Sequence, residues 1–274
     1  MKHGTVFNIA HRGASSIAPE NTLIAARKAY ELGAHMWETD VAVTKDGQLI
    51  LFHNDSLAHT TNAASRFPDR KPWCFAAFTL EEIRSLDAGS WFLDSALHPQ
   101  AECLVSKEEL ESYREAKVPT LAEAIELTRS LDWKINLEIK EQPEPLRQFP
   151  IVDQLLEEID RMQFPADRFV VSSFRHSWLR KIQRQKPSFK VEALVRFPER
   201  LPLNRERFTF DTYNIDRGLI GKSDLRKIAE KGLRVNLYNV NSREDMIRFI
   251  EAGASGIITD FPQTMRSLGY YRAS

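Results

Sequence analysis

The stretch MWETDVAV at residues 36–43 predicts a β-strand that carries two acidic side chains on one face. Apolar and β-branched residues surround Glu38 and Asp40, which are two positions apart, and side chains at i and i+2 point to the same side of a strand. Their Cα atoms therefore lie roughly 7 Å apart, close enough for both carboxylates to bind one hard cation. The alternate residues, beginning with Trp37, face the other side, where helices can cover them.

A second apolar segment, 48–52, follows a turn at 45–47 and ends on His53. Two carboxylates that lead to a histidine are costly to bury unless they have a partner or a chemical task. The alternative is an edge strand whose acidic side chains face solvent. The apolar neighbours favour a functional site over that alternative.

Strands and helices alternate along most of the chain. Eight strands are predicted at 5–10, 36–43, 134–140, 168–174, 190–195, 208–214, 233–239 and 256–259. Helices are predicted at 22–32, 120–130, 146–162, 178–185, 222–231, 243–252 and from about 262. Asn21 or Thr22 can cap the first helix, and Gly33 suits its C-terminal end. This order predicts an α/β fold, the TIM (β/α)8 barrel. An open doubly wound sheet is the alternative, but no glycine-rich phosphate-binding turn follows the first strand.

One domain is expected over residues 1–274, because 274 residues suffice for a single large barrel. The alternation loosens between about 54 and 118, where prolines and scattered aromatic residues dominate. One short helix is predicted there at 79–86, with Thr79 and Glu82 in a capping box. This segment is predicted to be a small insertion after the second strand that folds over the site.

The composition restricts the class of partner and the location. The 38 basic and 38 acidic residues cancel, so nothing indicates nucleic acid or an anionic membrane as the main partner. No apolar run approaches the ~18–20 residues that span a bilayer, and a strand that begins at Thr5 leaves no room for a signal peptide. Cys74 and Cys103 are too few for a disulfide framework. We therefore expect a cytoplasmic protein with free thiols, and its oligomeric state stays open.

In a TIM barrel, catalytic residues lie at the C-terminal ends of the strands, and the unusual polar residues of this chain fall there. Glu38, Asp40 and Glu138 would form an oxygen-rich site that suits Mg²⁺ or Ca²⁺ and disfavours zinc and copper. Arg12 and Lys140 add positive charge that would clamp an anionic substrate, most naturally a phosphate. Alternatively, Glu138 and Lys140 pair with each other or with Arg12.

Two histidines stand at the edge of this predicted site. Beside a cation and a phosphate, His11 and His53 become a general acid and a general base, with the assignment of the two roles left open. The other histidines lack this context and are predicted to be structural. Ser172 and Ser173 are predicted to hydrogen-bond within the barrel, since no G-x-S-x-G motif indicates a serine nucleophile.

Several motifs follow one another nearly end to end along the chain. They are HRG (11–13), PENT (19–22), ETDV (38–41), TKDG (44–47), the segment from His53 to TTN (60–62), LDAGSWF (86–92), VPTL (118–121), LEIK (137–140), SSF (172–174) and GIITDFP (256–262). In this order they closely resemble the glycerophosphodiester phosphodiesterase family. The resemblance implies a TIM barrel with an insertion after the second strand and a divalent metal held by the three carboxylates. It also implies acid–base catalysis by both histidines, phosphate contacts from Arg12 and Lys140, and hydrolysis of a small glycerophosphodiester to glycerol 3-phosphate and an alcohol.

The sequence departs from the family pattern at three positions. Asn54 stands where the family usually has Asp, and His59 stands where Arg is usual. Tyr238 stands where Trp is frequent, in a segment expected to line the substrate pocket. Its ring is expected to pack against the glycerol carbons while its hydroxyl meets water. These departures bear on substrate preference and rate, because they leave the metal and acid–base set intact.

Two rival functions remain. One is a lysophospholipase D or sphingomyelinase D-like phosphodiesterase, but the sphingomyelinase D type is secreted and disulfide-bonded, and this chain shows neither feature. The other is a non-catalytic protein that binds phosphodiester headgroups. Binding alone needs no acid–base pair, so the presence of both histidines argues against it.

Overall fold

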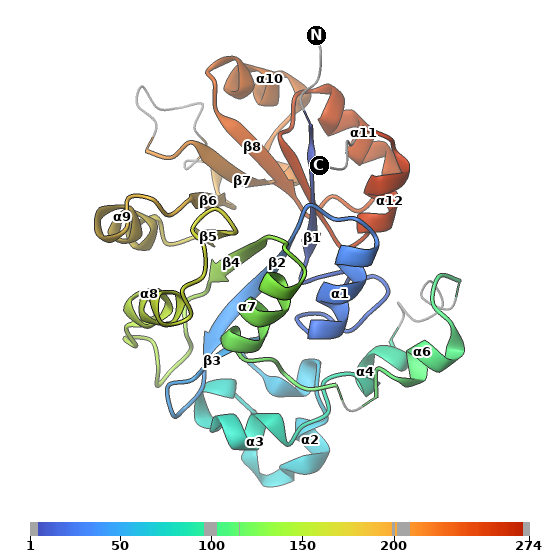
Figure 1. Cartoon of the computed structure of the whole chain (residues 1–274), viewed down its shortest axis with the longest axis vertical. Helices are drawn as coiled ribbons and strands as arrows, with labels where there is room; N and C mark the ends of the chain where they lie inside the picture. Colours follow the sequence, from blue (N-terminus) through green and yellow to red (C-terminus); the bar gives the residue numbers. More distant parts are fainter. Residues whose placement is uncertain (1–4, 96–102, 115, 199–200, 202–208, 271–274) are drawn as a thin grey trace.

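In the computed structural model, residues 5–95, 103–114, 116–198, 201 and 209–270 are described. Among them, eight parallel strands close into a barrel, which confirms the predicted TIM fold (Figure 1). The strands are β1 (Phe7–His11), β2 (Met36–Val43), β4 (Ile135–Ile139), β5 (Phe169–Ser173), β6 (Val191–Val195), β7 (Thr212–Asp216), β8 (Arg234–Tyr238) and β9 (Gly256–Thr259). β1 pairs with both β2 and β9, so the first and last strands of the chain close the barrel.

Helices surround the barrel in the order expected of alternating β and α elements (Figure 1). They are α1 (Leu23–Glu31), α7 (Leu121–Ser130), α8 (Ile151–Arg161), α9 (His176–Gln185), α10 (Lys222–Glu230), α11 (Arg243–Glu251) and α12 (Pro262–Ser267). Thr22 caps α1 by accepting a hydrogen bond from the backbone N–H of Ala25, and Gly33 follows the helix with a φ of 74°. Both of these predicted helix ends are therefore confirmed.

The two faces of β2 have different environments, as the alternation predicts. On the outer face, the indole Nε1 of Trp37 donates to Thr128 Oγ1 of α7 at 3.0 Å. The hydroxyl of Thr39 donates to the side chain of Asn21 at 2.7 Å. With these residues turned outward, Glu38 and Asp40 point to the barrel interior, and both are buried.

A short strand, β3 (Leu49–Leu51), runs antiparallel to the end of β2. Beyond it, the backbone N–H of Phe52 donates to the carbonyl of Asp40 at 2.9 Å. This hairpin therefore returns the chain to the C-terminal end of the barrel and delivers His53 beside Asp40.

The segment between β3 and α7 is more helical than predicted, so the expectation of one short helix was wrong. It contains α2 (Ala63–Arg66), α3 (Leu80–Arg84), α4 (Ser90–Leu93), α6 (Lys107–Glu111) and 3₁₀ turns at Leu57–His59, Pro68–Arg70 and Phe75–Ala77. Each of these elements is three to five residues long. Such segments are too short to leave a periodic pattern in the sequence. The capping box of Thr79 and Glu82 at α3 is confirmed.

This segment forms a small core of its own. Phe75 and Phe78 are buried in one cluster with Ile50 and Phe52 of the β2–β3 hairpin. In Figure 1, the helices α2 and α3 of this segment lie beyond β3.

Two predicted boundaries were wrong. β7 begins at Thr212 and not at 208, and residues 202–208 lie outside the described part of the chain. Pairing of Asn214 with both Leu194 and Asn236 sets the register of β7. α8 begins at Ile151 and not at 146, directly after Pro150. In the described ranges, every helix is too short or too polar to cross a membrane.

Candidate active site

The C-terminal ends of the strands surround a cavity of about 450 Å³. Seven of the eight predicted site residues line it: His11, Arg12, Glu38, His53, Glu138, Lys140 and Tyr238. The eighth, Asp40, contacts Arg12 and Lys140 beneath the surface of the cavity. Among the described residues from 54 to 118, none lines the cavity, so the expectation that the insertion folds over the site was wrong. A cavity of about 510 Å³ at the opposite end of the barrel contains none of these eight residues.

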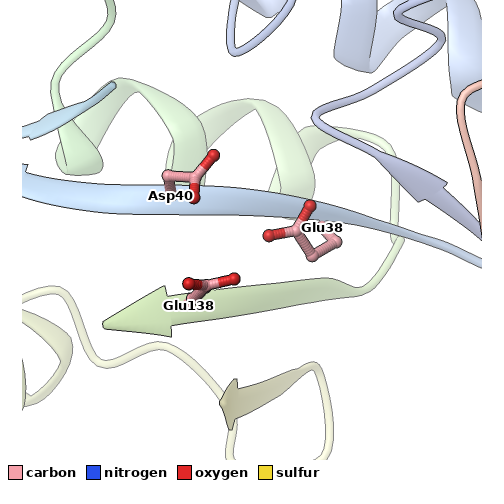
Figure 2. A group of neighbouring side chains, drawn as sticks. All are labelled: Glu38, Asp40 and Glu138. Atoms are coloured by element: carbon pink, nitrogen blue, oxygen red, sulfur yellow. The ribbon is translucent and has the colours of Figure 1, made fainter. Parts of the chain in front are cut away.

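Three carboxylates gather on two neighbouring strands. Figure 2 shows Glu38 and Asp40 on β2 and Glu138 on β4, where Asp40 and Glu138 occupy paired positions. Each carboxylate offers one oxygen atom, and these three oxygen atoms lie within 4.8 Å of one another. The Oε1 atom of Glu38 is buried without a hydrogen-bond partner in the described structure. An unpartnered buried oxygen within a group of hard oxygen ligands fits one divalent cation.

The protonation preferences of the three carboxylates differ because their neighbours differ. Burial, and then the charge of Asp40, raises the pKa of Glu138 to about 7. Burial and the charges of the other two acids also raise the pKa of Glu38 well above its usual value. Although burial opposes it, the charges of Arg12 and Lys140 lower the pKa of Asp40 to about 2. Asp40 is therefore a firm carboxylate, and positive charge beside the other two would favour their ionised forms.

Asp40 is held from three sides. Its carboxylate lies 3.3 Å from Arg12 Nε and 3.6 Å from Lys140 Nζ. The side-chain amide of Asn21 donates to it at 3.0 Å. These contacts decide the alternative pairing raised from the sequence: in the described structure, Lys140 pairs with Asp40 and not with Glu138. The role of Asn21 was missed, since the sequence indicated only a helix cap.

A left-handed turn after β1 positions Arg12. The φ angle of Arg12 is 54°, and its backbone N–H donates to Glu38 at 3.1 Å. Gly13 follows with a φ of 84°, and a Cβ there would lie 2.5 Å from the carbonyl carbon of Ala25, so glycine is required. The guanidinium contacts Glu20 Oε1 at 3.0 Å as well as Asp40. Although burial opposes it, these acids hold the pKa of Arg12 above its usual value.

His11 is paired with Asp260, a residue that sequence reasoning did not assign to the site. The Nδ1 atom of His11 lies 2.6 Å from Asp260 Oδ1. Asp260 also accepts hydrogen bonds from Ser15 at 3.1 Å and from Asn241 at 2.5 Å. These bonds, foremost that from His11, outweigh burial and lower the pKa of Asp260 to about 2. A signal was present, because Asp260 directly follows the last strand in the motif GIITDFP.

The side-chain nitrogen of Asn239 also lies close to His11 Nδ1, at 2.9 Å. One ring nitrogen cannot donate to Asp260 and accept from an amide N–H together, so the shorter contact with the carboxylate decides the tautomer. Nδ1 of His11 carries the proton that Asp260 accepts, and Nε2 is left for the cavity.

His53 has a different environment. Its Nδ1 atom lies 3.2 Å from Asn54 Oδ1. Burial, together with the charges of Arg12 and Lys140, lowers the pKa of His53 to about 4, although Asp40 opposes the shift. His53 is therefore neutral at neutral pH. Of the two departures near it, Asn54 contacts the ring, whereas His59 lies in a 3₁₀ turn outside the lining of the cavity.

Of the residues predicted to be structural, three make the hydrogen bonds given below, whereas Ser172 lines the active-site cavity. His35 accepts a hydrogen bond from the backbone of Asn8, and His176 bonds the carbonyl of Leu194. Ser173 donates to the carbonyl of Ile139 at 2.9 Å. His3 and His98 lie outside the described residues.

Tyr238 lines the cavity, but the expectation that its hydroxyl meets water was wrong. The hydroxyl donates to the carbonyl of Val195 at 2.9 Å, at the end of β6. The ring packs edge-to-face on Phe174, with centroids 6.2 Å apart. Tyr238 therefore connects two strand ends across the barrel mouth and presents part of its ring to the cavity.

Comparison with known proteins shows a family match over nearly the whole chain and the same fold in solved structures. The model of the glycerophosphoryl diester phosphodiesterase family matches residues 11–264. A glycerophosphodiester phosphodiesterase of Caldanaerobacter subterraneus is 34% identical over 267 residues, which cover 95% of this chain and 96% of the relative.

Two solved structures carry the comparison to three dimensions. A Silicibacter pomeroyi protein is 25% identical to this chain and superposes on it with a TM-score of 0.80. The match covers 97% of this chain and 94% of the Silicibacter chain. An Oleispira antarctica phosphodiesterase, solved in complex with its product sn-glycerol-3-phosphate, is 26% identical with a TM-score of 0.77 and 94% coverage of each chain. With a match over nearly its whole length, this chain belongs to the glycerophosphoryl diester phosphodiesterase family.

Proposed function

We propose that this chain hydrolyses glycerophosphodiesters to glycerol 3-phosphate and a free alcohol, using one divalent cation and two histidines. One observation carries the proposal: a buried group of three carboxylates lies in the same cavity as His11 and His53, whose environments differ. Family membership supports the reaction, and the relative from Oleispira antarctica binds sn-glycerol-3-phosphate as its product.

The carboxylates of Glu38, Asp40 and Glu138 would hold the cation, either Mg²⁺ or Ca²⁺. The unpartnered Oε1 atom of Glu38 and the all-oxygen ligand set support this assignment. When bound, the cation neutralises charge on the phosphodiester and on the carboxylates around it. It also keeps His53 neutral, because a nearby positive charge disfavours the imidazolium form.

Arg12 and Lys140 would contact the phosphate oxygens at the wall of the cavity. Arg12 is fixed by Glu20 and Asp40, so its guanidinium is already ordered before substrate arrives. Ordered donors lose little conformational entropy when they bind, and they stabilise charge that develops on the phosphoryl oxygens.

The two histidines would divide the proton transfers between them. His53, with a pKa lowered to about 4, is unprotonated at neutral pH and can accept a proton from the attacking hydroxyl. His11, protonated on both ring nitrogens before the reaction, would donate its Nε2 proton to the oxygen of the leaving alcohol, while Asp260 accepts at Nδ1 and orients the ring. Asp260 is a positioning residue in this scheme, and the histidines are the catalytic residues.

We further propose a small-molecule substrate and a cytoplasmic location, with no nucleic acid or stably inserted membrane segment involved. Cys74 is a free thiol in the described structure, which fits a reducing compartment. The lipid-directed phosphodiesterase and the non-catalytic binder remain the rival functions, and one experiment separates them from the proposal.

That experiment measures glycerol 3-phosphate release from glycerophosphocholine, glycerophosphoethanolamine and glycerophosphoglycerol by the purified protein. Parallel reactions contain lysolipids, and each is repeated after chelation and after adding back Mg²⁺ or Ca²⁺. We expect release from the glycerophosphodiesters that chelation abolishes and metal restores. Faster turnover of lysolipids would favour the lipid-directed enzyme, and binding without any turnover would favour the binder.

A further inference from the structure

A second hollow opens from the wall of the active site, on the side of β5 and β6. Its volume is about 510 Å³. The residues that line it are Glu141, Phe174, Arg175, His176, Ser177, Arg180, Leu194, Arg196 and Phe197. Five of them, Glu141, Phe174, Arg175, Leu194 and Arg196, line the active-site cavity as well. The two hollows therefore meet at a shared wall.

The second hollow has an excess of positive charge. Three arginines line it, and Glu141 is the one acid among the described lining residues. Glu141 pairs with Arg175 Nε at 2.5 Å. Within the described ranges, Arg180 and Arg196 form no close ion pair with an acid, although the charge of Arg196 acts on Glu138 and opposes the rise in its pKa. Two guanidinium groups are thus left to face solvent or a ligand.

Aromatic side chains hold one of these groups in place. The guanidinium carbon of Arg196 lies 4.7 Å from the ring centroid of Phe174 and 5.3 Å from that of Phe197. A guanidinium that lies against aromatic rings keeps its N–H groups free in the plane of the fork, where they can bind two oxygens of one anion. Phe197 is 45% exposed, so its ring stands at the rim of the hollow.

We propose that this hollow, the arginine subsite, binds one alcohol arm of the substrate and selects arms that carry their own negative charge. The inference rests on the proposed function. A phosphodiester held beside the carboxylates has two alcohol arms. One of them can extend past residues that line both hollows, among them Phe174, Arg175 and Arg196, and enter the second hollow. A phosphate or carboxylate on that arm would then meet Arg180 and Arg196. A cationic arm such as choline would meet like charge.

The test compares substrates that differ only in the charge of the leaving alcohol. The substrates are glycerophosphocholine, glycerophosphoglycerol, and glycerophosphoglycerol bearing a terminal phosphate. We expect kcat/KM at low salt to be about tenfold or more higher for the phosphorylated arm than for the neutral one, as charge-assisted hydrogen bonds imply. Choline should be the poorest arm, and the preference should shrink as salt rises. Equal kcat/KM for all three substrates would overturn the inference.

Arg180 allows a selective variant, because it lines the second hollow and not the active-site cavity. Arg180→Glu should remove most of the preference for the phosphorylated arm over the neutral arm. Arg180→Lys should retain part of the preference. Arg184→Glu is the matched control, since it makes the same charge change one turn later on α9, outside both hollows. A preference that survives Arg180→Glu, or that Arg184→Glu removes equally, would contradict the subsite.

The same arginines could instead bind phosphate groups on an anionic lipid surface. Sedimentation with phosphatidylglycerol vesicles separates the two sources of phosphate. If Arg180→Glu releases the protein from vesicles but leaves the ratio of kcat/KM values unchanged, the hollow docks lipid and the subsite is wrong. If none of the substrates is turned over, the proposed function fails on its own. Calorimetric binding of the phosphorylated and neutral substrates to the same variants then decides the subsite.

Discussion

His11 Nδ1 lies 2.6 Å from Asp260 Oδ1, although 249 positions separate the two residues in the chain. Closure of the barrel brings them together, because β1 pairs with β9 and Ala10 lies opposite Thr259. Asp260 is anchored in turn by Ser15 and Asn241. A catalytic histidine held by an ordered carboxylate has one tautomer and one ring orientation.

Replacing Asp260 with Asn should therefore harm catalysis more than binding. The change keeps the shape but removes the acceptor that holds the Nδ1 proton of His11. We expect kcat to fall about 10- to 100-fold with little change in KM, by analogy with other carboxylate–histidine pairs. Steady-state kinetics with glycerophosphoglycerol checks this, with Asp224→Asn on the outer helix α10 as the control. An unchanged kcat per folded molecule, or a loss explained by melting temperature alone, would argue against a positioning role.

The pH dependence of kcat/KM should show the low pKa of His53. A general base works unprotonated, so activity should hold as pH falls from 8 and decline only as pH approaches about 4, the pKa of His53. His53→Gln should reduce activity and remove this acid limb, whereas His59→Gln should leave the limb in place. Measurements at saturating metal separate the limb from loss of the cation. An acid limb near the ordinary histidine pKa of about 6.5 would contradict this assignment.

Glu138→Gln tests the metal site with two readouts. The substitution removes one of three carboxyl groups, each of which offers an oxygen within 4.8 Å of the others. Without metal, the variant should melt at the same temperature as the parent or higher, because repulsion between carboxylates is relieved. The rise in melting temperature on adding Mg²⁺ or Ca²⁺ should shrink, and activity should recover partly at high metal concentration. The exposed Glu126→Gln is the control. Full activity of the parent after exhaustive chelation would refute the metal proposal.

The sequence was most informative where strand periodicity alone decides which way a side chain points. Glu38 and Asp40 share a face because they are two apart, and Glu138 joins them because β4 pairs with β2 in register. A barrel then brings the C-terminal ends of all strands to one mouth. Seven of the eight predicted residues line one cavity, and of these seven Tyr238 was indicated by the family resemblance and not by these local rules.

The contacts that the sequence did not reveal depend on how distant segments meet. Asp260 and Asn239 contact His11 only because the last strands of the barrel close against the first. The hydroxyl of Tyr238 donates a hydrogen bond to the carbonyl of Val195, and the position of that carbonyl depends on the curvature of the sheet. The register of β7 is set by its pairing with β6 and β8, which are distant in the sequence. The arginine subsite likewise gathers residues that follow three different strands.

The remaining prediction concerns the attacking group. The substrate's own 2-hydroxyl can lose its proton to His53 and attack phosphorus. The P–O bond to the leaving alcohol then breaks, and His11 protonates that alcohol. The resulting cyclic 1,2-phosphate is opened by water to glycerol 3-phosphate. Intramolecular attack gains roughly several kcal/mol from proximity in favourable geometries. A water molecule, by contrast, has to be positioned separately. Both routes use the same two histidines.

A substrate whose 2-hydroxyl is replaced by hydrogen distinguishes the two routes. If the 2-hydroxyl attacks, the analogue should compete with glycerophosphoglycerol at a similar inhibition constant, because the proposed phosphate contacts of Arg12 and Lys140 do not involve the 2-hydroxyl. Its own turnover should be slower by about 100-fold or more, since the nucleophile is missing. Phosphorus NMR of the normal reaction should then also show the cyclic phosphate before glycerol 3-phosphate accumulates. Turnover of the analogue near the normal rate would reject the cyclic route and leave direct attack by water, with His53 still acting as the base.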